Sequence, residues 1–346
     1  MLEETLFSIE MPYRQDMNVK SFSFGVTADG RVLGEDGDAD AATKDELENA
    51  ACFVAGVRGN EIQQTYVCAR IVRKLRKLES ECALVPGKRI MVIPCVNPAS
   101  MNNRKRFWVG DNTDVNRMMP GYDLGETTQR IAGALFDHVR GFRYGIQLSS
   151  FYLEGDFLDH VRIMCGPGIQ DDNGADFGLA YVSKHVPGSF DTTTLHYNWR
   201  LWDTEAYTLY TKETDLVDEK SAASMVRACL RFLDARGLID RPCHGGMRAT
   251  TFAERGLVPV PVSRGGIFSR VAELGDIVSA GQLLAQVIDP LRGEVLEEIR
   301  APQGGVVFFA CRTPLVNEQT LAFQLVPRRI GKELLYERGN FLDPEA

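Results

Sequence analysis

The sequence predicts an α/β fold, a mixed sheet flanked by helices, followed by a C-terminal all-β domain. Between about residues 50 and 240, apolar runs of strand length alternate with amphipathic helical patterns, which is typical of α/β domains. After residue 247, short β-type runs separated by glycine turns replace this alternation. We therefore expect an α/β domain over residues 1–247, a small β barrel or sandwich over 248–330, and a C-terminal tail over 331–346.

The first strand–turn–helix unit surrounds the segment AGVRGNE. The apolar run ACFVAGV predicts a buried strand over 51–57, and apolar residues at helical spacing predict a helix over 60–79. Glycines flank Arg58 and predict a turn between the two elements. Glu61 falls at the start of the helix, where a carboxylate interacts favourably with the positive end of the helix dipole.

The following segments continue the alternation of strands and helices. The run RIMVIPCV predicts a second buried strand, which Asn97-Pro98 ends, and a loop rich in Asn, Asp and Gly follows. The remaining elements are predicted as helices over 125–142 and 219–237 and strands over 144–151 and 206–213. Gly237 is the expected C-terminal stop of the last helix.

The C-terminal β region contains two similar halves, RGGIFSRVAELGDIV and QGGVVFFACRTPLV, as expected of a small barrel or sandwich. It resembles a lipoyl or biotinyl carrier domain. The hairpin that carries the modified lysine in such domains corresponds here to residues 289–293, DPLRG, which contain no lysine. We therefore expect no covalently attached cofactor.

Composition excludes several classes of function. The net charge of −8 disfavours nucleic-acid binding, which depends on concentrated Lys and Arg. No apolar run approaches the roughly 20 residues that span a bilayer, so we expect no membrane partner. The N-terminus carries acids where a secretory signal would be basic and then apolar, and the eight cysteines form no CxxC pair. These features predict a cytoplasmic protein with reduced thiols.

Four motifs together resemble a known family. The segments AGVRGNE, VIPCVNP, RFWVGDNTDVNRMMPG and YTKE, followed by the β region, resemble the succinylglutamate desuccinylase and aspartoacylase family, which has a zinc-carboxypeptidase-like (M14) fold. The resemblance covers roughly residues 45–328, and DVNRMMPG is its most specific part. It implies hydrolysis of an amide bond beside a carboxylate, with zinc polarising the carbonyl group and acidifying a water molecule.

The resemblance also shows which residues stand at the zinc-ligand positions. The family's His, Glu and second His correspond here to Arg58, Glu61 and Ser149. A catalytic zinc ion typically keeps three protein ligands, and Arg58 is permanently charged, so we expect the usual zinc site to be absent. Arg58 would instead pair with Glu61 or take over the cationic role.

Another histidine could supply a replacement ligand. A rebuilt metal site is a second hypothesis, with His160 folding back toward Glu61, because Glu154 and Asp156 lie close to His160 in sequence. Three further histidines, His185, His196 and His244, fit no ligand spacing.

The substrate-side positions of the family are retained. Asn116 and Arg117 match the pair that binds the substrate's carboxylate, a task suited to a planar guanidinium beside an amide. The alternative is that Arg117 pairs with Asp114 or caps a loop. Arg106 matches the arginine that steadies the carbonyl oxygen. Glu213 matches the carboxylate that activates the attacking water, and its alternative is a surface residue at a strand end.

Three functional hypotheses follow. The chain is an amide hydrolase with a non-standard metal centre, or a metal-free protein that binds a small carboxylate such as an N-acyl amino acid and serves as a sensor or as the partner of an active relative. In the third hypothesis, Arg58 serves as the electrophilic group in place of zinc and stabilises an oxyanion. Enzymatic turnover and a homo-oligomeric state are both left open by the sequence.

Overall fold

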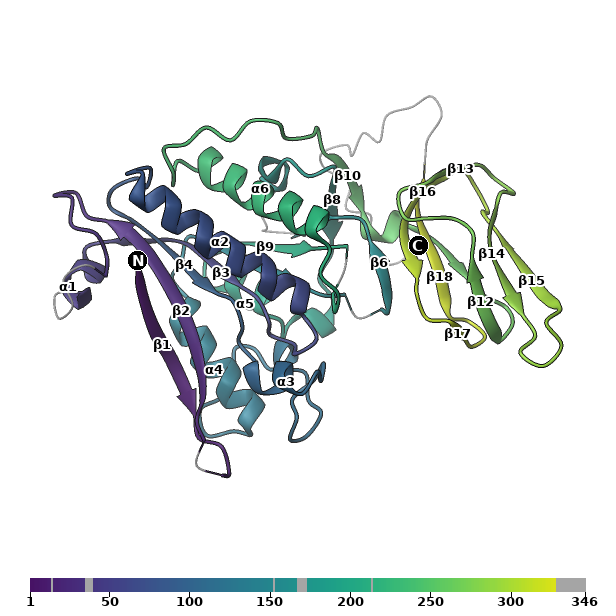
Figure 1. Cartoon of the computed structure of the whole chain (residues 1–346), viewed down its shortest axis with the longest axis horizontal. Coiled ribbons are helices and arrows are strands. Elements are labelled where there is room, and N and C mark those ends of the chain that lie inside the picture. Colours follow the sequence, from purple (N-terminus) through teal and green to yellow (C-terminus); the bar gives the residue numbers. More distant parts are fainter. Residues whose placement is uncertain (14, 35–39, 152, 167–172, 213, 328–346) are drawn as a thin grey trace. The chain divides into compact units, whose positions relative to one another are not determined.

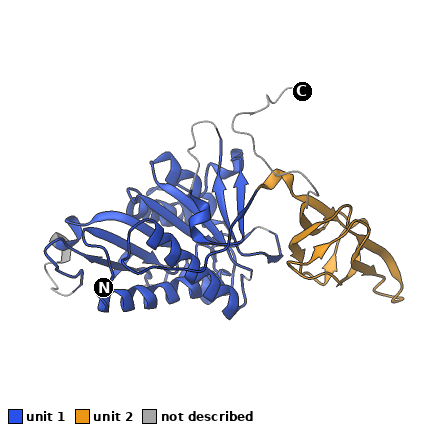
Figure 2. Cartoon of the chain, turned by 90° about the horizontal axis from the view of Figure 1, so that it is seen from above, with its two compact units in different colours: residues 1–251 blue, residues 252–346 orange. Residues whose placement is uncertain are grey.

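The computed structural model describes the chain except residues 14, 35–39, 152, 167–172, 213 and 328–346, and it divides into two compact units (Figure 2). Unit 1 comprises Met1–Thr251 and unit 2 comprises Phe252–Ala346. The boundary expected from the sequence, between residues 247 and 248, lies shortly before this division. The expected tail over 331–346 lies outside the described residues.

Unit 1 is built on a mixed sheet that has nine strands in the described part of the chain, in the order β1-β2-β4-β3-β5-β9-β7-β8-β10 (Figure 1). Its centre is parallel, because β3 pairs in parallel with both β4 and β5, and β5 pairs in parallel with β9. The antiparallel pairs are β1–β2, β2–β4 and β7–β9. The strand bounds are β1 Leu2–Ile9, β2 Met17–Val26, β3 Glu48–Val54, β4 Lys88–Ile93, β5 Tyr144–Ser149, β7 His160–Met164, β8 Tyr181–His185, β9 Glu205–Tyr210 and β10 Thr250–Ala253. A short strand, β6 (Gly155–Phe157), lies outside this order.

Helices cover both faces of the sheet. The bounds of the α-helices are α1 Asp40–Asp45, α2 Ile62–Ser80, α3 Pro98–Asn102, α4 Thr127–Val139, α5 Leu195–Leu201 and α6 Glu219–Ala235. Single 3-10 turns include η2 (Val115–Arg117), η3 (Gly174–Phe177) and η4 (Ser189–Asp191). In the part of the chain that the structure describes, no helix is both long enough and apolar enough to cross a membrane.

Two apolar cores lie on opposite faces of the sheet. Alternate residues of a strand point to opposite faces, and β3 shows this directly, since Phe53 belongs to one core and Val54 to the other. The first core is completed by α2 and α6, which contact each other (Figure 1). The second is completed by α4 and α5. Burial on both faces explains why the central strands are continuous apolar runs in the sequence.

The main elements expected from the sequence are present, and the α/β class with a C-terminal all-β region is confirmed. The helix expected over 60–79 is α2, and the helices expected over 125–142 and 219–237 are α4 and α6. The four expected strands correspond to β3, β4, β5 and β9, with ends that differ by a few residues. The N-terminal hairpin β1–β2 and the β7–β8 pair were not specifically predicted.

The carboxyl ends of β3, β5 and β9 meet at one edge of the sheet, because these three strands are parallel. Ligands of open α/β sheets bind at this edge. After β3 the chain turns sharply at Gly56, which has a φ of +60°. A Cβ atom there would lie 2.8 Å from both the Cys95 Cα and the Thr65 Oγ1. Only glycine fits both the conformation and the space, and this turn carries Arg58 to the sheet edge.

Unit 2 contains two antiparallel sheets. One includes β11-β18-β16-β13 and the other is ordered β15-β14-β12-β17. The strand bounds are β11 Val258–Pro261, β12 Gly266–Arg270, β13 Ile277–Val278, β14 Leu283–Ile288, β15 Val295–Arg300, β16 Gly305–Cys311, β17 Leu315–Val316 and β18 Leu321–Pro327. The rings of Phe268 on β12 and Phe323 on β18 lie 6.1 Å apart, so the two sheets share an aromatic core.

Close packing against Gly145 predicts a stability effect. A Cβ atom at Gly145 on β5 would lie 2.6 Å from Cδ2 of Trp199, a fully buried residue of α5. We expect Gly145→Ala to lower the free energy of unfolding by about 1–3 kcal/mol, because overpacking forces a displacement of the indole or the strand. Urea denaturation measures this change. Gly188→Ala is the control, since its nearest atom would be 3.9 Å away, and equal stability of the two variants would contradict the prediction.

Candidate functional site

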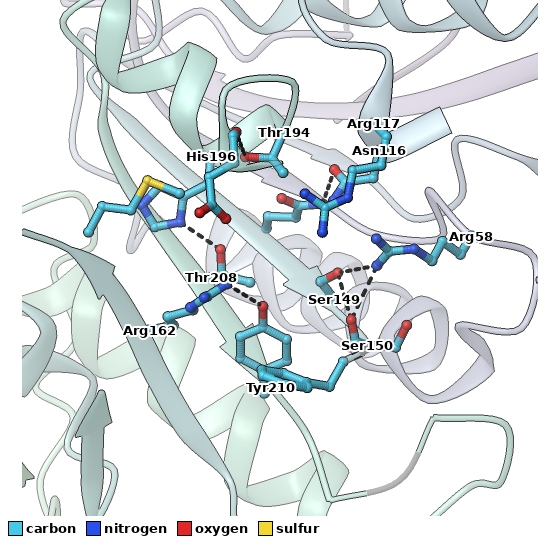
Figure 3. A pocket seen from close by; sticks show the side chains of 14 residues that line it. Arg58, Asn116, Arg117, Ser149, Ser150, Arg162, Thr194, His196, Thr208 and Tyr210 are labelled. Atoms are coloured by element: carbon cyan, nitrogen blue, oxygen red, sulfur yellow. Dashed lines mark hydrogen bonds between the residues drawn. The ribbon is translucent and has the colours of Figure 1, made fainter. Parts of the chain in front are cut away.

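A pocket opens where β5, β9 and β7 lie side by side in unit 1 (Figure 3). Its side chains come from the turn after β3, the end of β5, the strands β7 and β9, the helix α5 and the turns η2 and η4. The lining residues are Arg58, Asn116, Arg117, Gln147, Ser149, Ser150, Phe151, Arg162, Met164, Asp191, Thr194, His196, Thr208 and Tyr210. Three of them are arginines and one is a carboxylate, so the pocket is suited to an anion.

Glu61 lies at the N-cap position of α2 and has no exposed surface. Its Oε1 accepts hydrogen bonds from the backbone nitrogen and hydroxyl of Ser150, both at 2.9 Å, and from the Ser149 hydroxyl at 3.1 Å. Its Oε2 accepts from the backbone nitrogen of Arg58 at 3.2 Å. Both oxygens of this buried carboxylate are therefore used by donors of the protein itself.

The guanidinium of Arg58 fills the space between the ends of β3 and β5. Its Nε and Nη2 form a two-pronged ion pair with Asp114, with Nη2 at 2.9 Å from Oδ2 and Nε at 3.0 Å from the same oxygen. Its Nη1 lies 3.3 Å from the Ser149 hydroxyl and 3.5 Å from Glu61 Oε1. Arg58 thus pairs with Glu61, as one sequence hypothesis held, but its closer partner is Asp114.

The charges around Arg58 keep it protonated. Burial alone would lower its pKa, but the negative charges of Asp114 and Glu61 and the hydrogen bonds to Asp114 outweigh burial, and the pKa lies above its usual value. Only 5% of the residue is exposed. A buried charge is tolerated when it is paired and hydrogen-bonded, and both conditions hold here.

The donor set at this corner does not fit a zinc ion. Zinc takes thiolate, imidazole or carboxylate ligands, whereas the three positions implied by the resemblance hold a guanidinium, a carboxylate that already accepts four close hydrogen bonds, and a hydroxyl. A dication at this place would have to displace the Arg58 guanidinium. Among the described residues, no three or more His, Cys, Asp or Glu side chains lie together so as to hold a metal.

The replacement ligand considered from the sequence has other partners. His160 lies on β7 and is buried, with its Nδ1 2.7 Å from the carbonyl oxygen of Leu158. Its ring stacks on Tyr210 at a centroid distance of 4.9 Å. The structure therefore gives no support to a metal site shared by His160 and Glu61.

Asn116 and Arg117 both line the pocket, on the turn η2. Asp114 caps this turn by accepting from the backbone nitrogen of Asn116 at 3.0 Å. The Asn116 side-chain oxygen accepts from Gln147 at 3.0 Å, which leaves its amide nitrogen without a partner among the described residues. Arg117 donates to the carbonyl oxygen of Phe190 and forms no ion pair within the described part of the chain. The alternative pairing of Arg117 with Asp114 is not what the structure shows, because Asp114 pairs with Arg58.

Arg106 does not line the pocket. Its Nη2 donates to the carbonyl oxygen of Phe151 at 2.8 Å, and its guanidinium lies over the ring of Phe107. Burial, and secondarily the charge of Arg58, lower its pKa from the usual value. In this structure Arg106 supports the segment that follows β5 and does not reach the pocket itself.

Glu213, the expected water-activating carboxylate, lies outside the described residues. The chain on either side of it is held by hydrogen bonds. The backbone nitrogen of Lys212 donates to Asp159 at 2.9 Å, and the carbonyl oxygen of Thr214 accepts from the backbone of Gln63 at 3.0 Å. Burial raises the pKa of Asp159 to about 6, although its hydrogen bonds with Ser221 and Lys212 oppose this shift.

Sequence reasoning missed the side of the pocket formed by β7, β9, α5 and η4. Arg162 and Thr208 are direct cross-strand partners on β7 and β9, so their side chains share one face of the sheet. The Asp191 carboxylate accepts a hydrogen bond from His185 at 2.8 Å. Burial alone would raise the pKa of Asp191, but the hydrogen bonds from His185 and from the backbone nitrogen of Gly188 lower it to about 2. His196 lies in α5, two residues after the N-cap residue Thr194. A threonine at this place was the one sequence signal that could have predicted the start of a helix here.

The comparisons with known proteins agree with this architecture. Residues 48–148 match the model of the succinylglutamate desuccinylase/aspartoacylase catalytic domain. The matched segment runs from β3 to β5 and includes Arg58, Glu61, Asn116 and Arg117, so it holds most of the corner described above. Comparison with curated protein sequences finds no match.

Solved structures share the fold over nearly the whole chain. A succinylglutamate desuccinylase/aspartoacylase from Rhodobacter sphaeroides superposes with a TM-score of 0.73 at 15% identity, covering 93% of each chain. A succinylglutamate desuccinylase from Silicibacter sp. TM1040 has a TM-score of 0.71 at 16% identity, covering 90% of this chain and 88% of that one. The ectoine utilization protein EutE from Ruegeria pomeroyi, in a product-bound structure, has a TM-score of 0.69 at 16% identity, covering 90% of each chain. At these identities the likeness establishes the shared fold.

The Arg58 network predicts a large effect of removing its cation. We expect Arg58→Met to lower the free energy of unfolding by about 3–5 kcal/mol, because it leaves the buried carboxylate of Glu61 and the partly buried carboxylate of Asp114 without their counter-charge. Urea denaturation at neutral pH measures the loss. Arg140→Met is the matched control: its pair with Asp137 is exposed, and we expect it to cost less than about 1 kcal/mol. Similar stabilities of the two variants would refute the role assigned to the Arg58 guanidinium.

Proposed function

We propose that this protein binds a small carboxylate of the N-acyl amino acid class in the pocket, and that it does so without zinc. The observation that carries the proposal is the place of the Arg58 guanidinium, which is buried against Glu61 and Asp114 where the resemblance implies a metal ion. The pocket beside it keeps the substrate-side residues Asn116 and Arg117.

The chemistry of Asn116 and Arg117 favours a carboxylate. A guanidinium donates two parallel hydrogen bonds to the two oxygens of a carboxylate, and an amide nitrogen supplies a further donor. Arg117 has no carboxylate partner among the described residues, whereas Arg58 faces two. The positive charge that an incoming anion meets is therefore that of Arg117, joined by Arg162 on the other side of the pocket.

Electrostatics support function without zinc. Two unit positive charges about 4 Å apart repel by roughly 4 kcal/mol at an effective dielectric constant near 20, and a dication doubles that value. Binding zinc here would also require Glu61, which has no exposed surface, to give up hydrogen bonds to Ser150. The three ligand positions offer zinc only one carboxylate and no imidazole, so little coordination energy is available to offset these two costs.

A reducing location fits the cysteines. All eight belong to the described part of the chain and all are free thiols. Disulfides are rare in the cytosol and common in secreted proteins. We place the protein in the cytoplasm on this basis.

The role of Arg117 predicts a loss of ligand affinity. We expect Arg117→Ala to weaken binding of N-acetyl-L-amino acids by about 10- to 100-fold, the range for hydrogen bonds to a charged group. Arg117→Lys should recover only part of the loss, because an ammonium group lacks the planar fork. Isothermal titration calorimetry measures the affinities, and Arg140→Ala is the exposed control. Binding that is unaffected by Arg117→Ala would remove the proposed carboxylate site.

Amide hydrolysis with a non-standard metal centre is the second candidate, and the family match of residues 48–148 favours it. Metal content and turnover separate the two. On the proposal, purified protein contains far less than one equivalent of zinc, and added zinc does not raise its melting temperature, since an ion that binds only the folded state would stabilise it. Stoichiometric zinc together with hydrolysis of an N-acyl amino acid, abolished by Glu213→Gln, would establish the hydrolase instead.

A further inference from the structure

Gln147 is a buried polar residue of β5 whose side chain lines the pocket. Only 1% of the residue is exposed, and its backbone lies between two parallel neighbours, since it is the register partner of Val54 on β3 and of Thr208 on β9. Its Nε2 donates a hydrogen bond of 3.0 Å to the side-chain oxygen of Asn116. This bond therefore joins the centre of the sheet to the turn η2.

The direction of this hydrogen bond decides which end of the Asn116 amide is left for a ligand. The terminal torsion of an asparagine side chain has two broad minima, which exchange the places of the oxygen and the nitrogen. Because Gln147 donates, the Asn116 oxygen faces Gln147, and the amide nitrogen is left without a partner among the described residues. Asp114 holds only the backbone of Asn116, so the bond from Gln147 is what orients the amide.

We infer that Gln147 is a positioning residue, which turns the amide nitrogen of Asn116 toward the ligand and thereby makes the site prefer a carboxylate to a neutral carboxamide. The inference rests on the proposed function, since it supposes that Asn116 and Arg117 hold the carboxylate of the ligand. In Figure 3 these two residues lie beside each other at the pocket.

Two oriented donors distinguish the two ligand groups. Both oxygens of a carboxylate accept hydrogen bonds, so Arg117 and the Asn116 nitrogen can each donate to one of them. A carboxamide has one oxygen and one NH₂ group, and one of the two donors would then face that NH₂ group. If the Asn116 amide were free to turn over, its oxygen could accept from the NH₂ group, and the distinction would be weaker.

Glutamine is suited to this task because it donates without carrying a net charge. A glutamate at position 147 could only accept when ionised, and it would bring a negative charge into a pocket that we propose takes an anion. A lysine would donate, but it would add a further positive charge to a pocket that is already lined by three arginines. The neutral donor orients Asn116 and leaves the charge of the pocket unchanged.

A matched pair of probes, N-acetyl-L-alanine and N-acetyl-L-alaninamide, tests the inference by isothermal titration calorimetry, because the two differ only in the carboxylate and the carboxamide. We expect the wild-type chain to bind the acid at least about tenfold more tightly. Gln147→Met keeps a side chain of similar length but removes the donor. It should weaken binding of the acid about three- to tenfold, the effect of one lost hydrogen bond, and should change the affinity for the amide less than about twofold.

A double-mutant cycle separates positioning from direct contact with the ligand. If Gln147 acts through Asn116, Gln147→Met in the Asn116→Ala background should change the affinity for the acid less than about twofold. Gln147→Glu is the second variant, and it carries the test if Gln147→Met does not fold. Its carboxylate can only accept, so it should turn the Asn116 oxygen toward the ligand. The preference for the acid should therefore fall further when Asn116 is present than in the Asn116→Ala background.

Gln63→Met is the matched control for the loss of a buried glutamine. Gln63 on α2 is fully buried and its amide also donates to an oxygen, the carbonyl of Asp218, but it is not among the residues that line the pocket. We expect this variant to leave the ratio of the acid and amide affinities unchanged. Melting temperatures without ligand measure any general damage in each variant.

The possible outcomes distinguish the inference from the function on which it rests. A preference for the acid that falls in the Gln147 variants, but only when Asn116 is present, supports the positioning role. An effect that persists in full without Asn116, or that weakens both probes equally, overturns that role. If the acid binds through Arg117 and the Gln147 variants leave its preference intact, the positioning role is wrong and the proposed function stands. If neither probe binds the wild-type chain, both are wrong.

Discussion

The geometry of the pocket depends on one buried cation. Arg58 lies on the turn after β3, yet its guanidinium reaches Ser149 and Ser150 at the end of β5 and Asp114 at the start of η2. Three segments that are distant in sequence are thereby fixed at the carboxyl edge of the sheet. A bound metal would ordinarily join ligands from separate segments in this way, and here a side chain of the protein makes the connections.

The charge balance of this network shapes the rest of the pocket. Arg58 brings one positive charge, and Glu61 and Asp114 bring two negative charges, so the corner carries no surplus of positive charge to offer a ligand. Attraction of an anion falls to the arginines outside the network, Arg117 and Arg162. The corner thus forms one wall of the pocket, and other lining residues lie on η2 and along β7 and β9.

The sequence predicted the central elements because burial on both faces of a parallel sheet leaves clear apolar runs, as in β3 and β4. The family resemblance assigned Arg58, Glu61 and Ser149 to the three zinc-ligand positions, and their side chains contact one another in the structure. The sequence did not predict Asp114 as the main partner of Arg58, because a contact between residues 56 positions apart in a loop leaves no periodic signal. His196 was missed for a similar reason: its place in the pocket follows from the seven-residue helix α5, which is too short to show a helical pattern.

Asp114 has two duties, because it binds the guanidinium of Arg58 and also caps the turn that presents Asn116. The Asp114 side chain therefore links Arg58 to the turn that carries Asn116 and Arg117. Replacing Arg58 by histidine to install a metal ion would remove the ion-pair partner of Asp114. The same substitution would weaken the capping of the turn that carries Asn116 and Arg117. Installing a metal ion at this corner would therefore need several changes made together, including a new counter-charge for Asp114.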